Sequence, residues 1–331
     1  MKICVAGDGA WGTALALTLL HNGHRVVVWG AFPDYLDEMR TTRENYRFLP
    51  GVRLPDTLEF SSDMSVALAD ADMVLLSTPT QYLRPVLKQI CGNFAPDSVF
   101  VNVAKGIEVG SWKRISEIVA DEIGRVTFVD LSGPSHAEEV SRNVPTAVVA
   151  ASEDINAAET VQSVFMNEFF RVYTSDDVTG VELGGAIKNV MAIAAGIIDG
   201  MGLGDNSKAA MMTRGIAEMS RLGEALGGKR STFSGLSGIG DLIVTCTSGH
   251  SRNRHVGEEL GRGRQLDAII KSMNMVVAEG VATARGAYEL ARQVKVDTPI
   301  IDEVYNVIYN NSSAVAAVRS LMNRKARQEN D

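Results

Sequence analysis

The sequence is poor in cysteine and proline, carries fewer basic than acidic residues, and has no long uninterrupted apolar run. Its three cysteines, Cys4, Cys91 and Cys246, form no CxxC pair and its histidines do not cluster, so we expect neither a disulfide framework nor a metal site. A formal net charge of −8 argues against a general nucleic-acid-binding protein, so any bound anion must meet a local basic cluster. Because no apolar run reaches the roughly 18 residues of a membrane span, we predict no membrane insertion.

The rest of the composition is that of an ordinary globular protein, with 45% hydrophobic and 22% charged residues. A chain of 331 residues favours two domains, each with its own core. The chain opens directly on the apolar stretch MKICVAG, without the pattern of a signal peptide, which predicts a cytoplasmic location.

The first thirty residues contain the strongest single motif. An apolar run at residues 3–6 predicts a short buried strand, the turn GDGAWG follows at once, and residues 13–22 have a helical pattern. In this GxGxxG turn, Gly7 permits the tight bend, Gly9 lets a pyrophosphate approach the backbone, and Gly12 allows the helix to pack closely on the strand. The motif therefore predicts a dinucleotide cofactor, NAD or NADP, rather than an incidental glycine turn.

The end of the second predicted strand, residues 25–29, leaves the choice between NAD and NADP open. An acidic residue there would bind the ribose 2′-hydroxyl of NAD, whereas an arginine would bind the 2′-phosphate of NADP. The strand is followed by GAFPD, in which Asp34 lies beyond a proline, and Arg40 and Arg43 lie on the next predicted helix. Neither an acidic residue nor an arginine directly follows the strand, so the sequence does not decide between NAD and NADP.

Strand-helix units resume at residue 73, where apolar runs predict strands and amphipathic patterns predict the helices between them. The predicted strands are residues 73–77, 99–103, 127–131, 146–150 and 170–173, and the helices are residues 83–90 and 114–122. Repeated units of this kind imply an α/β Rossmann domain with a doubly wound, mostly parallel sheet that binds ligands at the carboxyl ends of its strands. Lys105 follows one such strand and is well placed to meet a ligand anion.

After residue 173, helical patterns cover nearly all of the chain. They span residues 184–199, 207–226, 266–273, 281–293, 300–309 and 314–325. We therefore predict an all-α C-terminal domain. With the boundary at residue 177, residues 1–177 form the NAD(P)-binding domain and residues 178–331 form the helical substrate-binding domain.

One lysine lies inside an otherwise apolar helix. Gly184 and Gly185 precede Lys188 by one turn, and Ala192 and Ala195 follow it on the same side, so this face carries very small side chains. Such a face lets a bound molecule approach closely, and partial burial lowers a lysine pKa towards the range that is useful for proton transfer. Lys188 is therefore a candidate general acid/base. From these residues alone, a solvent-reaching lysine at the start of the helix is the simpler interpretation.

A cluster of polar residues interrupts the helical patterns of the C-terminal half of the sequence. The segment from Gly238 to Cys246 has an irregular pattern, and residues 251–255, SRNRH, gather two arginines, an asparagine and a serine in an acidic chain. A guanidinium with neighbouring amide and hydroxyl donors suits a phosphate or a carboxylate, and Ser251 is a residue type that caps helices. A solvated basic turn explains the same residues equally well.

Together these motifs carry a resemblance. The segments GDGAWGTALA, NVAKGIE, LSGPSHAEEV, GAIKNVMAIAAGIIDGMGLGDN, GIGDLIVTCT, SRNRHVG and VVAEGVATA are similar, in order and over nearly the whole chain, to those of bacterial-type NAD(P)-dependent glycerol-3-phosphate dehydrogenases. The resemblance implies a Rossmann domain, a helical substrate domain and a homodimer. It also implies interconversion of dihydroxyacetone phosphate and sn-glycerol 3-phosphate, which supplies glycerophospholipid synthesis.

The resemblance implies roles for individual residues, with Lys188 matching the family's proton acceptor. The cofactor positions, together with the glycines of the turn, are Gly7, Gly9, Ala10, Trp11, Gly12, Ala31, Lys105, Ala137, Arg252, Val277 and Glu279. The substrate positions are Lys105, Gly133, Ser135, Lys188, Asn189, Asp241, Thr245, Ser251, Arg252 and Asn253.

Two positions depart from the family pattern. Many relatives have serine or threonine where this chain has Ala10, and histidine or arginine where it has Ala31. The second departure removes a partner for a 2′-phosphate, so a strong preference for NADPH is not expected. A related two-domain reductase of hydroxy acids or ketoacids would explain the glycine turn and Lys188 but not SRN or GDLIVTCT. A catalytically inactive NAD(P)-binding sensor would not need a lysine that faces the nicotinamide.

Overall fold

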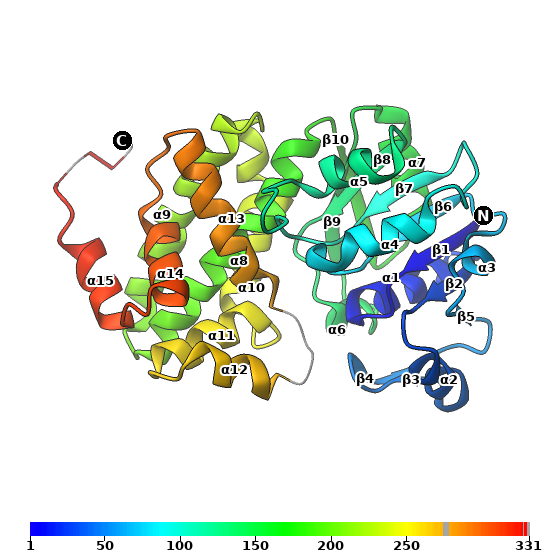
Figure 1. Ribbon diagram of the computed structural model, residues 1–331, viewed down its shortest axis with the longest axis horizontal. Coiled ribbons are helices and arrows are strands. Elements are labelled where there is room, and N and C mark those ends of the chain that lie inside the picture. The colour runs from blue at the N-terminus through cyan, green and yellow to red at the C-terminus, as the bar shows by residue number, and fades with distance from the viewer. Residues whose placement is uncertain (274–277, 327, 330–331) are drawn as a thin grey trace.

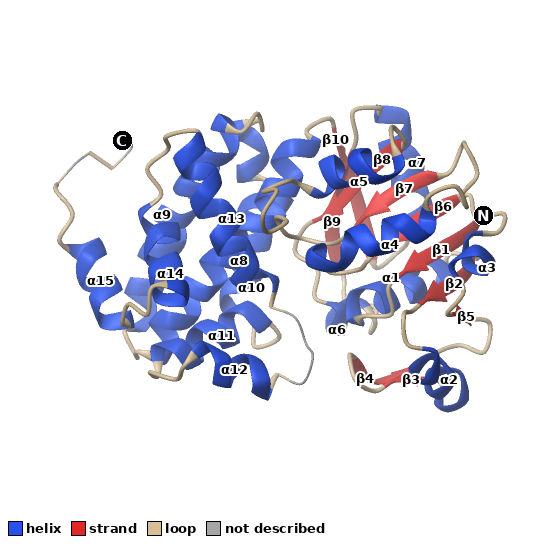
Figure 2. Cartoon of the chain, in the orientation of Figure 1, coloured by secondary structure: helices blue, strands red, loops and turns tan. Residues whose placement is uncertain are grey.

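The computed structural model describes residues 1–273, 278–326 and 328–329, so Val277, one of the expected cofactor positions, lies outside the described residues. Figure 1 shows an N-terminal part built on a sheet beside a C-terminal part built of helices. In Figure 2 the strands of the described chain are confined to the N-terminal part. The predicted fold class, a Rossmann domain followed by an all-α domain, is confirmed.

The main sheet has eight strands in the order β10-β9-β8-β7-β6-β1-β2-β5, and neighbouring strands are parallel except for β8 and β9. Its strands are β1 (Lys2–Ala6), β2 (Arg25–Trp29), β5 (Glu59–Ser61), β6 (Met73–Leu76), β7 (Val99–Asn102), β8 (Thr127–Ser132), β9 (Thr146–Ala151) and β10 (Phe170–Ser175). A separate antiparallel pair joins β3 (Glu44–Asn45) and β4 (Leu49–Arg53). The strand order reverses between β1 and β6, which is where open α/β sheets bind their ligands.

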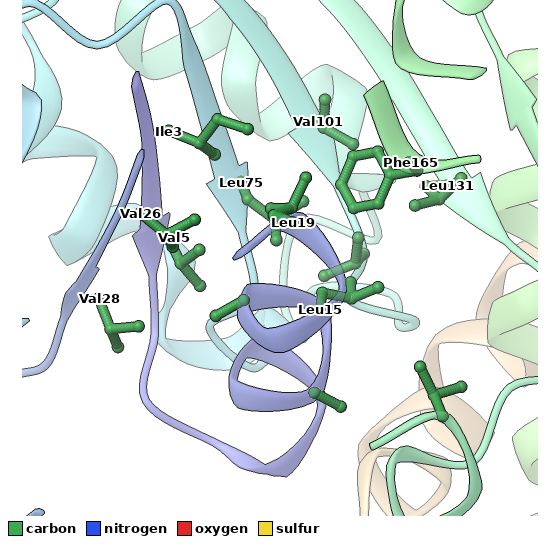
Figure 3. Packing of buried hydrophobic residues seen from close by; sticks show 14 of the residues in the cluster. Ile3, Val5, Leu15, Leu19, Val26, Val28, Leu75, Val101, Leu131 and Phe165 are labelled. Atoms are coloured by element: carbon green, nitrogen blue, oxygen red, sulfur yellow. The ribbon is translucent and has the colours of Figure 1, made fainter. Parts of the chain in front are cut away.

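Helices cover both faces of the sheet because successive residues of a buried strand point to opposite faces. These helices are α1 (Ala10–His21), α2 (Pro33–Thr42), α3 (Met64–Leu68), α4 (Leu83–Ile90), α5 (Ile115–Ile123), α6 (Ala137–Val140) and α7 (Ile155–Phe165), with the short 3-10 helix η1 (Thr80–Tyr82) before α4. Ile3 and Val5 of β1 pack with Leu15 and Leu19 of α1 and with Phe165 of α7 (Figure 3). The alternate residues of β1 belong to a second core with α3, α4 and α5.

The described residues of the C-terminal part form helices joined by turns and loops. Its helices are α8 (Val178–Gly200), α9 (Gly204–Ala225), η2 (Arg230–Ser234), η3 (Leu236–Gly240), α10 (Asp241–Thr247), α11 (Arg252–Gly261), α12 (Leu266–Ser272), α13 (Glu279–Gln293), α14 (Pro299–Tyr309) and α15 (Ala314–Met322). Their apolar side chains form one core around α8, which lies at the centre of this part in Figure 1.

Helix α8 is the one described helix that is long and apolar enough to cross a membrane. However, 94% of its most apolar window is buried inside the protein. It is therefore the core helix of the C-terminal domain, and its apolar character reflects contacts with protein on every side.

Helices α8 and α11 approach each other so closely that only glycines fit between them. A Cβ on Gly196 of α8 would lie 2.0 Å from the carbonyl oxygen of Arg254, and one on Gly257 of α11 would lie 2.0 Å from the carbonyl oxygen of Ile193. Gly200 and Gly261 repeat the arrangement one turn further along. This contact fixes the register of α11, whose first turn carries the SRN residues, against the helix that carries Lys188.

Three expectations need correction. The segment from Gly238 to Cys246 is not irregular, since it comprises the end of the π-helical turn η3 and most of α10. Lys188 does not lie at a helix start, because α8 begins at Val178 and Lys188 is only 7% exposed in its middle. Between residues 31 and 72 the sequence analysis expected only the helix that carries Arg40 and Arg43; α2 ends at Thr42, so Arg43 lies just beyond it, and α3 and three short strands were not predicted.

Candidate active site

A buried charge cluster joins the two parts of the chain at the carboxyl ends of β7 and β8. Nζ of Lys105, in the loop after β7, donates to Oδ2 of Asp241 at 2.7 Å and to the carbonyl oxygen of Gly133 at 3.0 Å. Nζ of Lys188 lies 3.0 Å from the other carboxylate oxygen of Asp241 and donates to the Thr245 hydroxyl at 2.7 Å. Asp241 therefore holds two lysines from different domains, one on each oxygen.

Burial and the contacts within this cluster shift the pKa of both Lys188 and Asp241. Burial lowers the pKa of Lys188 to about 8, although Asp241 opposes the shift and Lys105 reinforces it. Burial raises the pKa of Asp241, but the two lysines outweigh burial and hold that pKa below its ordinary value. An ionised Asp241 between the two lysines is thus the stable arrangement, and Lys188 can be either charged or neutral near its lowered pKa.

The small residues of α8 make room for the cluster. A Cβ on Gly185 would meet the Ser132 hydroxyl at 2.8 Å and the aliphatic chain of Lys105 at 3.5 Å, so the absent side chain lets Lys105 reach Asp241. A Cβ on Gly184 would lie 2.6 Å from the carbonyl oxygen of Ser237, at the start of η3. These contacts explain why the residues before Lys188 are glycines.

A chain of amide contacts runs beside the lysines. Asn189 donates to the carbonyl oxygen of Lys105 at 3.1 Å and accepts from Asn253 at 2.9 Å, and Asn253 accepts from the backbone N–H of Gly280 at 3.0 Å. The chain connects the β7 loop, α8, α11 and α13. Asn189 and Asn253 therefore fix the relative positions of four elements as well as offering polar atoms to the site.

The start of α13 closes the same region. Oε1 of Glu279 accepts from the backbone N–H and the hydroxyl of Thr80 at 2.8 Å each, and Oε2 lies 3.4 Å from the backbone nitrogen of Lys105. Glu279 thereby ties the helical domain to the loops after β6 and β7. Ala137, the first residue of α6, is buried.

The glycine turn has the geometry that its motif predicts. Gly7 has φ +135, and a Cβ on it would lie 2.8 Å from the Ser77 hydroxyl. A Cβ on Gly12 would lie 2.4 Å from the carbonyl oxygen of Gly7, so α1 packs directly on the turn. A Cβ on Gly9 would meet nothing within 4 Å, which leaves the start of α1 open to a ligand phosphate.

The residues beside the turn are mostly apolar. Ala10 and Trp11 form the first turn of α1, and the indole N–H of Trp11 is buried without a hydrogen-bond partner among the described residues. Ala31 is exposed just beyond β2. Arg40 on α2 pairs with Asp37 and donates to the Phe60 carbonyl oxygen. Arg43 donates to the Leu58 carbonyl oxygen, so both guanidinium groups are engaged with protein groups.

The SRN residues begin α11. Ser251 is the N-cap, and its hydroxyl accepts from the backbone N–H of Arg254 at 3.2 Å, as its residue type suggested. Arg252 is exposed, and within the described chain its guanidinium makes no hydrogen bond or ion pair. On the sheet side, Ser135 donates to the Gly133 carbonyl oxygen that also receives Lys105.

The sequence analysis missed three residues that shape the site. Asn102 bonds both backbone atoms of Ala104 and donates to Asp130 at 2.5 Å, which fixes the loop leading to Lys105. His136 lies at the start of α6. Burial lowers the pKa of His136, and the nearby charge of Lys188 lowers it further. A polar residue that ends an apolar strand was the available signal for Asn102. No comparable signal marked Asp130 or His136.

Comparisons with known proteins agree over the whole chain. The family model described as NAD-dependent glycerol-3-phosphate dehydrogenase N-terminus matches residues 2–158, and that of the C-terminus matches residues 177–319. A glycerol-3-phosphate dehydrogenase [NAD(P)+] of Enterococcus faecalis is 48% identical, with 100% of this chain and 98% of that protein covered. The chain belongs to the NAD-dependent glycerol-3-phosphate dehydrogenase family.

Other members of the glycerol-3-phosphate dehydrogenase family are also similar over nearly the whole chain. The Bacillus cereus protein is 50% identical, with 99% of this chain and 97% of that protein covered. The crystal structure of glycerol-3-phosphate dehydrogenase from Coxiella burnetii has a TM-score of 0.94 and 36% identity, covering 98% of this chain and 99% of that chain. The chain is thus an NAD(P)-dependent oxidoreductase of this family, acting on a small molecule, and the expectation drawn from its motifs is confirmed.

Proposed function

We propose that this chain interconverts dihydroxyacetone phosphate and sn-glycerol 3-phosphate by hydride transfer with NAD(P), with Lys188 as the proton donor and acceptor. One observation carries the assignment of Lys188. It is a buried lysine whose pKa lies at about 8, held by Asp241 at the carboxyl end of a nucleotide-binding sheet. A lysine in that state can both give and take a proton near neutral pH.

The glycine turn fits a dinucleotide. Gly7 and Gly12 allow the tight approach of α1 to β1, and the open space at Gly9 leaves backbone N–H groups at the start of α1 for the pyrophosphate. Ala10, Trp11, Ala31, Lys105, Ala137, Arg252, Val277 and Glu279 complete the proposed cofactor site. When bound, the nicotinamide supplies or accepts the hydride.

Arg252, the cation at the start of α11, binds the substrate phosphate in this proposal. Arg252 is exposed at the start of α11, where the helix dipole also favours an anion, and its guanidinium is free of protein partners among the described residues. Asn253 and Ser251 lie beside it, and Lys105, which is paired with Asp241, is the second cation of the proposed site. Gly133, Ser135, Asn189, Asp241 and Thr245 complete the proposed substrate site.

The chain's own residues then move one proton. In the reductive direction, protonated Lys188 donates to the oxygen on carbon 2 as negative charge develops there. In the oxidative direction, neutral Lys188 takes the hydroxyl proton. Asp241 holds Lys188 in place through both states, and Thr245 accepts one of its N–H bonds, so the lysine does not need to reorient.

We further propose that the division into domains lies at residue 177, that the protein is a cytoplasmic homodimer, and that it supplies glycerophospholipid synthesis. Within the described ranges, the last β-strand ends at Ser175 and α8 begins at Val178, which supports the boundary. Size-exclusion chromatography with light scattering measures the mass, and a monomer at micromolar concentration would contradict the dimer.

The test of the proposed function is turnover of three mixtures. Each contains NADH or NADPH, with dihydroxyacetone phosphate, with a 2-oxo carboxylate of similar size, or with no second substrate. We expect rapid cofactor oxidation only with dihydroxyacetone phosphate. Preferred turnover of the carboxylate would indicate a ketoacid reductase, and binding of cofactor without turnover of either compound would indicate a sensor.

A further inference from the structure

The end of β2 lacks the acidic side chain that commonly binds the adenosine ribose of NAD. Gly30 and Ala31 follow Trp29, the last residue of β2, and neither offers a polar side chain. In a Rossmann sheet an Asp or Glu at this place accepts a hydrogen bond from the ribose 2′-hydroxyl and disfavours the 2′-phosphate of NADP. In this chain, an acceptor for the ribose 2′-hydroxyl must therefore come from a group outside β2.

The carboxylate of Asp8 occupies the space beside Gly30. Oδ2 of Asp8 lies 2.7 Å from the position that a Cβ on Gly30 would have, and Cγ lies 3.0 Å from it. The carboxylate thus stands where an acidic side chain at the end of β2 would begin, although it comes from the glycine turn. A side chain at position 30 would require Asp8 and Leu36 to move.

Oδ2 of Asp8 is buried without a hydrogen-bond partner among the described residues. A buried carboxylate oxygen with no donor is costly, and such atoms are rare in native proteins unless a ligand or water serves them. Burial raises the pKa of Asp8, while a bond to its own backbone N–H and the charge of Arg47 oppose that rise. A hydroxyl donor reaching Oδ2 would supply the missing bond and favour the ionised form.

The backbone of Asp8 is held by a buried network of side chains. The carbonyl oxygen of Asp8 accepts from Nδ2 of Asn45 at 2.8 Å, and Asn45 also donates to the Thr13 hydroxyl at 2.7 Å. The Tyr35 hydroxyl in turn donates to Oδ1 of Asn45 at 2.5 Å. This network connects the glycine turn to α2 and β3, and a ligand does not need to order it.

The cations near this end of the sheet are engaged with protein groups. Arg40 and Arg43 bond to carbonyl oxygens as described above, and Arg43 also lies 3.6 Å from Asp56. Arg47 stacks over the Tyr35 ring at 4.3 Å and donates to the Tyr46 hydroxyl at 3.1 Å. A 2′-phosphate beside Asp8 would therefore meet a carboxylate oxygen that has no hydrogen-bond donor among the described residues, while the nearby guanidinium groups are engaged elsewhere.

We propose that Asp8 is the residue that selects NAD over NADP in this chain, by accepting a hydrogen bond from the adenosine ribose 2′-hydroxyl. This inference rests on the proposed function only in requiring a dinucleotide at the glycine turn. It assigns to a residue inside the turn the role that the end of β2 ordinarily has.

Isothermal titration calorimetry with two unreactive probes tests the proposal without turnover. ADP-ribose carries the 2′-hydroxyl, and 2′-phospho-ADP-ribose carries the phosphate. We expect the intact protein to bind ADP-ribose at least about tenfold more tightly, because one charge-assisted hydrogen bond is replaced by repulsion. Asp8→Asn, which keeps the side-chain volume, should reduce this ratio by about tenfold or more. The ratio is measured on one protein sample, so a partly unfolded variant does not distort it.

Asp34→Asn is the matched control, since it removes an exposed carboxylate from the first turn of α2 without touching the Asp8 contacts. Its ratio should equal that of the unmodified protein. Equal binding of the two probes by the unmodified protein would overturn the proposal, and so would an unchanged ratio in Asp8→Asn or an equal effect of both substitutions. Failure of the unmodified protein to bind either probe would instead contradict the dinucleotide site and the proposed function itself.

Discussion

Replacing Asp241 with asparagine should move the pH dependence of the reaction in a direction fixed by the structure. Asp241 contacts Nζ of Lys188 at 3.0 Å and Nζ of Lys105 at 2.7 Å, and it opposes the fall in the Lys188 pKa that burial causes. Asparagine has nearly the same shape but no charge. Without the carboxylate, burial and the neighbouring ammonium of Lys105 both favour the neutral form of Lys188.

The size of the shift follows from the contact distance. An opposite charge within hydrogen-bond distance changes a pKa by about one to three units, so the Lys188 pKa should fall from about 8 by at least about one unit. Each unit corresponds to about 1.4 kcal/mol. Since removing one partner of a buried ion pair also costs roughly 3–5 kcal/mol of stability, the melting temperature of the variant must be measured first.

The assay is kcat/KM against pH from about 5 to 10 in both directions, and the unmodified protein's profile corrects for titration of the substrate phosphate near about pH 6. Oxidation needs neutral Lys188, so kcat/KM should rise through about pH 8 in the unmodified protein and through a lower pH in Asp241→Asn. Reduction needs the protonated form and should fall through the same midpoints. Thr245→Val is the control, because it removes a hydrogen bond to Lys188 but leaves the carboxylate. A slower Asp241→Asn variant with an unmoved midpoint would mean that Asp241 only positions the lysines.

Three further substitutions test other parts of the account. Lys188→Ala should lower kcat by about 10²–10⁴ with NADH affinity nearly unchanged in a fluorescence titration. Retention of most activity would mean that another residue donates and accepts the proton. Glu218, buried on α9, accepts from the first backbone N–H groups of α14, and burial raises its pKa from 4.5 to about 8. The folded state therefore holds a proton that the unfolded state loses between these values, and stability should fall as pH rises through this window by up to about 1.4 kcal/mol per unit. Urea unfolding should show this slope and show its absence in Glu218→Gln; a slope equal in both would place the titration in another group. Gly257→Ala should destabilise the protein by roughly 1–3 kcal/mol by forcing α8 and α11 apart, whereas Gly249→Ala, which meets nothing within 4 Å, should leave the melting temperature unchanged. Equal melting temperatures for the two glycine variants would show that the helix contact is not tight.

The sequence predicted what depends on local backbone geometry. The glycine turn between β1 and α1 is specified by three positions within six residues, so its conformation follows from the motif. The strands from β6 to β10 are short apolar runs and their centres were predicted correctly, with ends shifted by up to two residues. These features need no knowledge of distant contacts.

The charge cluster depended on contacts between segments that are distant in the chain. Lys188 was visible as a lysine among small residues, but its central place in α8 and its burial became clear only when β7, β8 and α10 were assembled around it. The segment from Gly238 to Cys246 contains two glycines and was predicted to be irregular, whereas tertiary packing against Gly184 and Phe233 holds its first residues in helical turns. Likewise, nothing local marked Asp130 as the partner of Asn102.

The most direct test of the central claim compares two substrates that differ only in the phosphate. Arg252→Ala should lose at least about a hundredfold in kcat/KM for dihydroxyacetone phosphate, equivalent to about 2.7 kcal/mol, and far less for dihydroxyacetone, which has no phosphate to bind. Both kcat and KM should change, because the energy of binding the phosphate also orients carbon 2. Since Arg252 is also a proposed cofactor contact, both substrates are measured at saturating NADH. Equal losses with the two substrates would contradict the account, because Arg252 would then serve the cofactor or the fold and not the substrate phosphate.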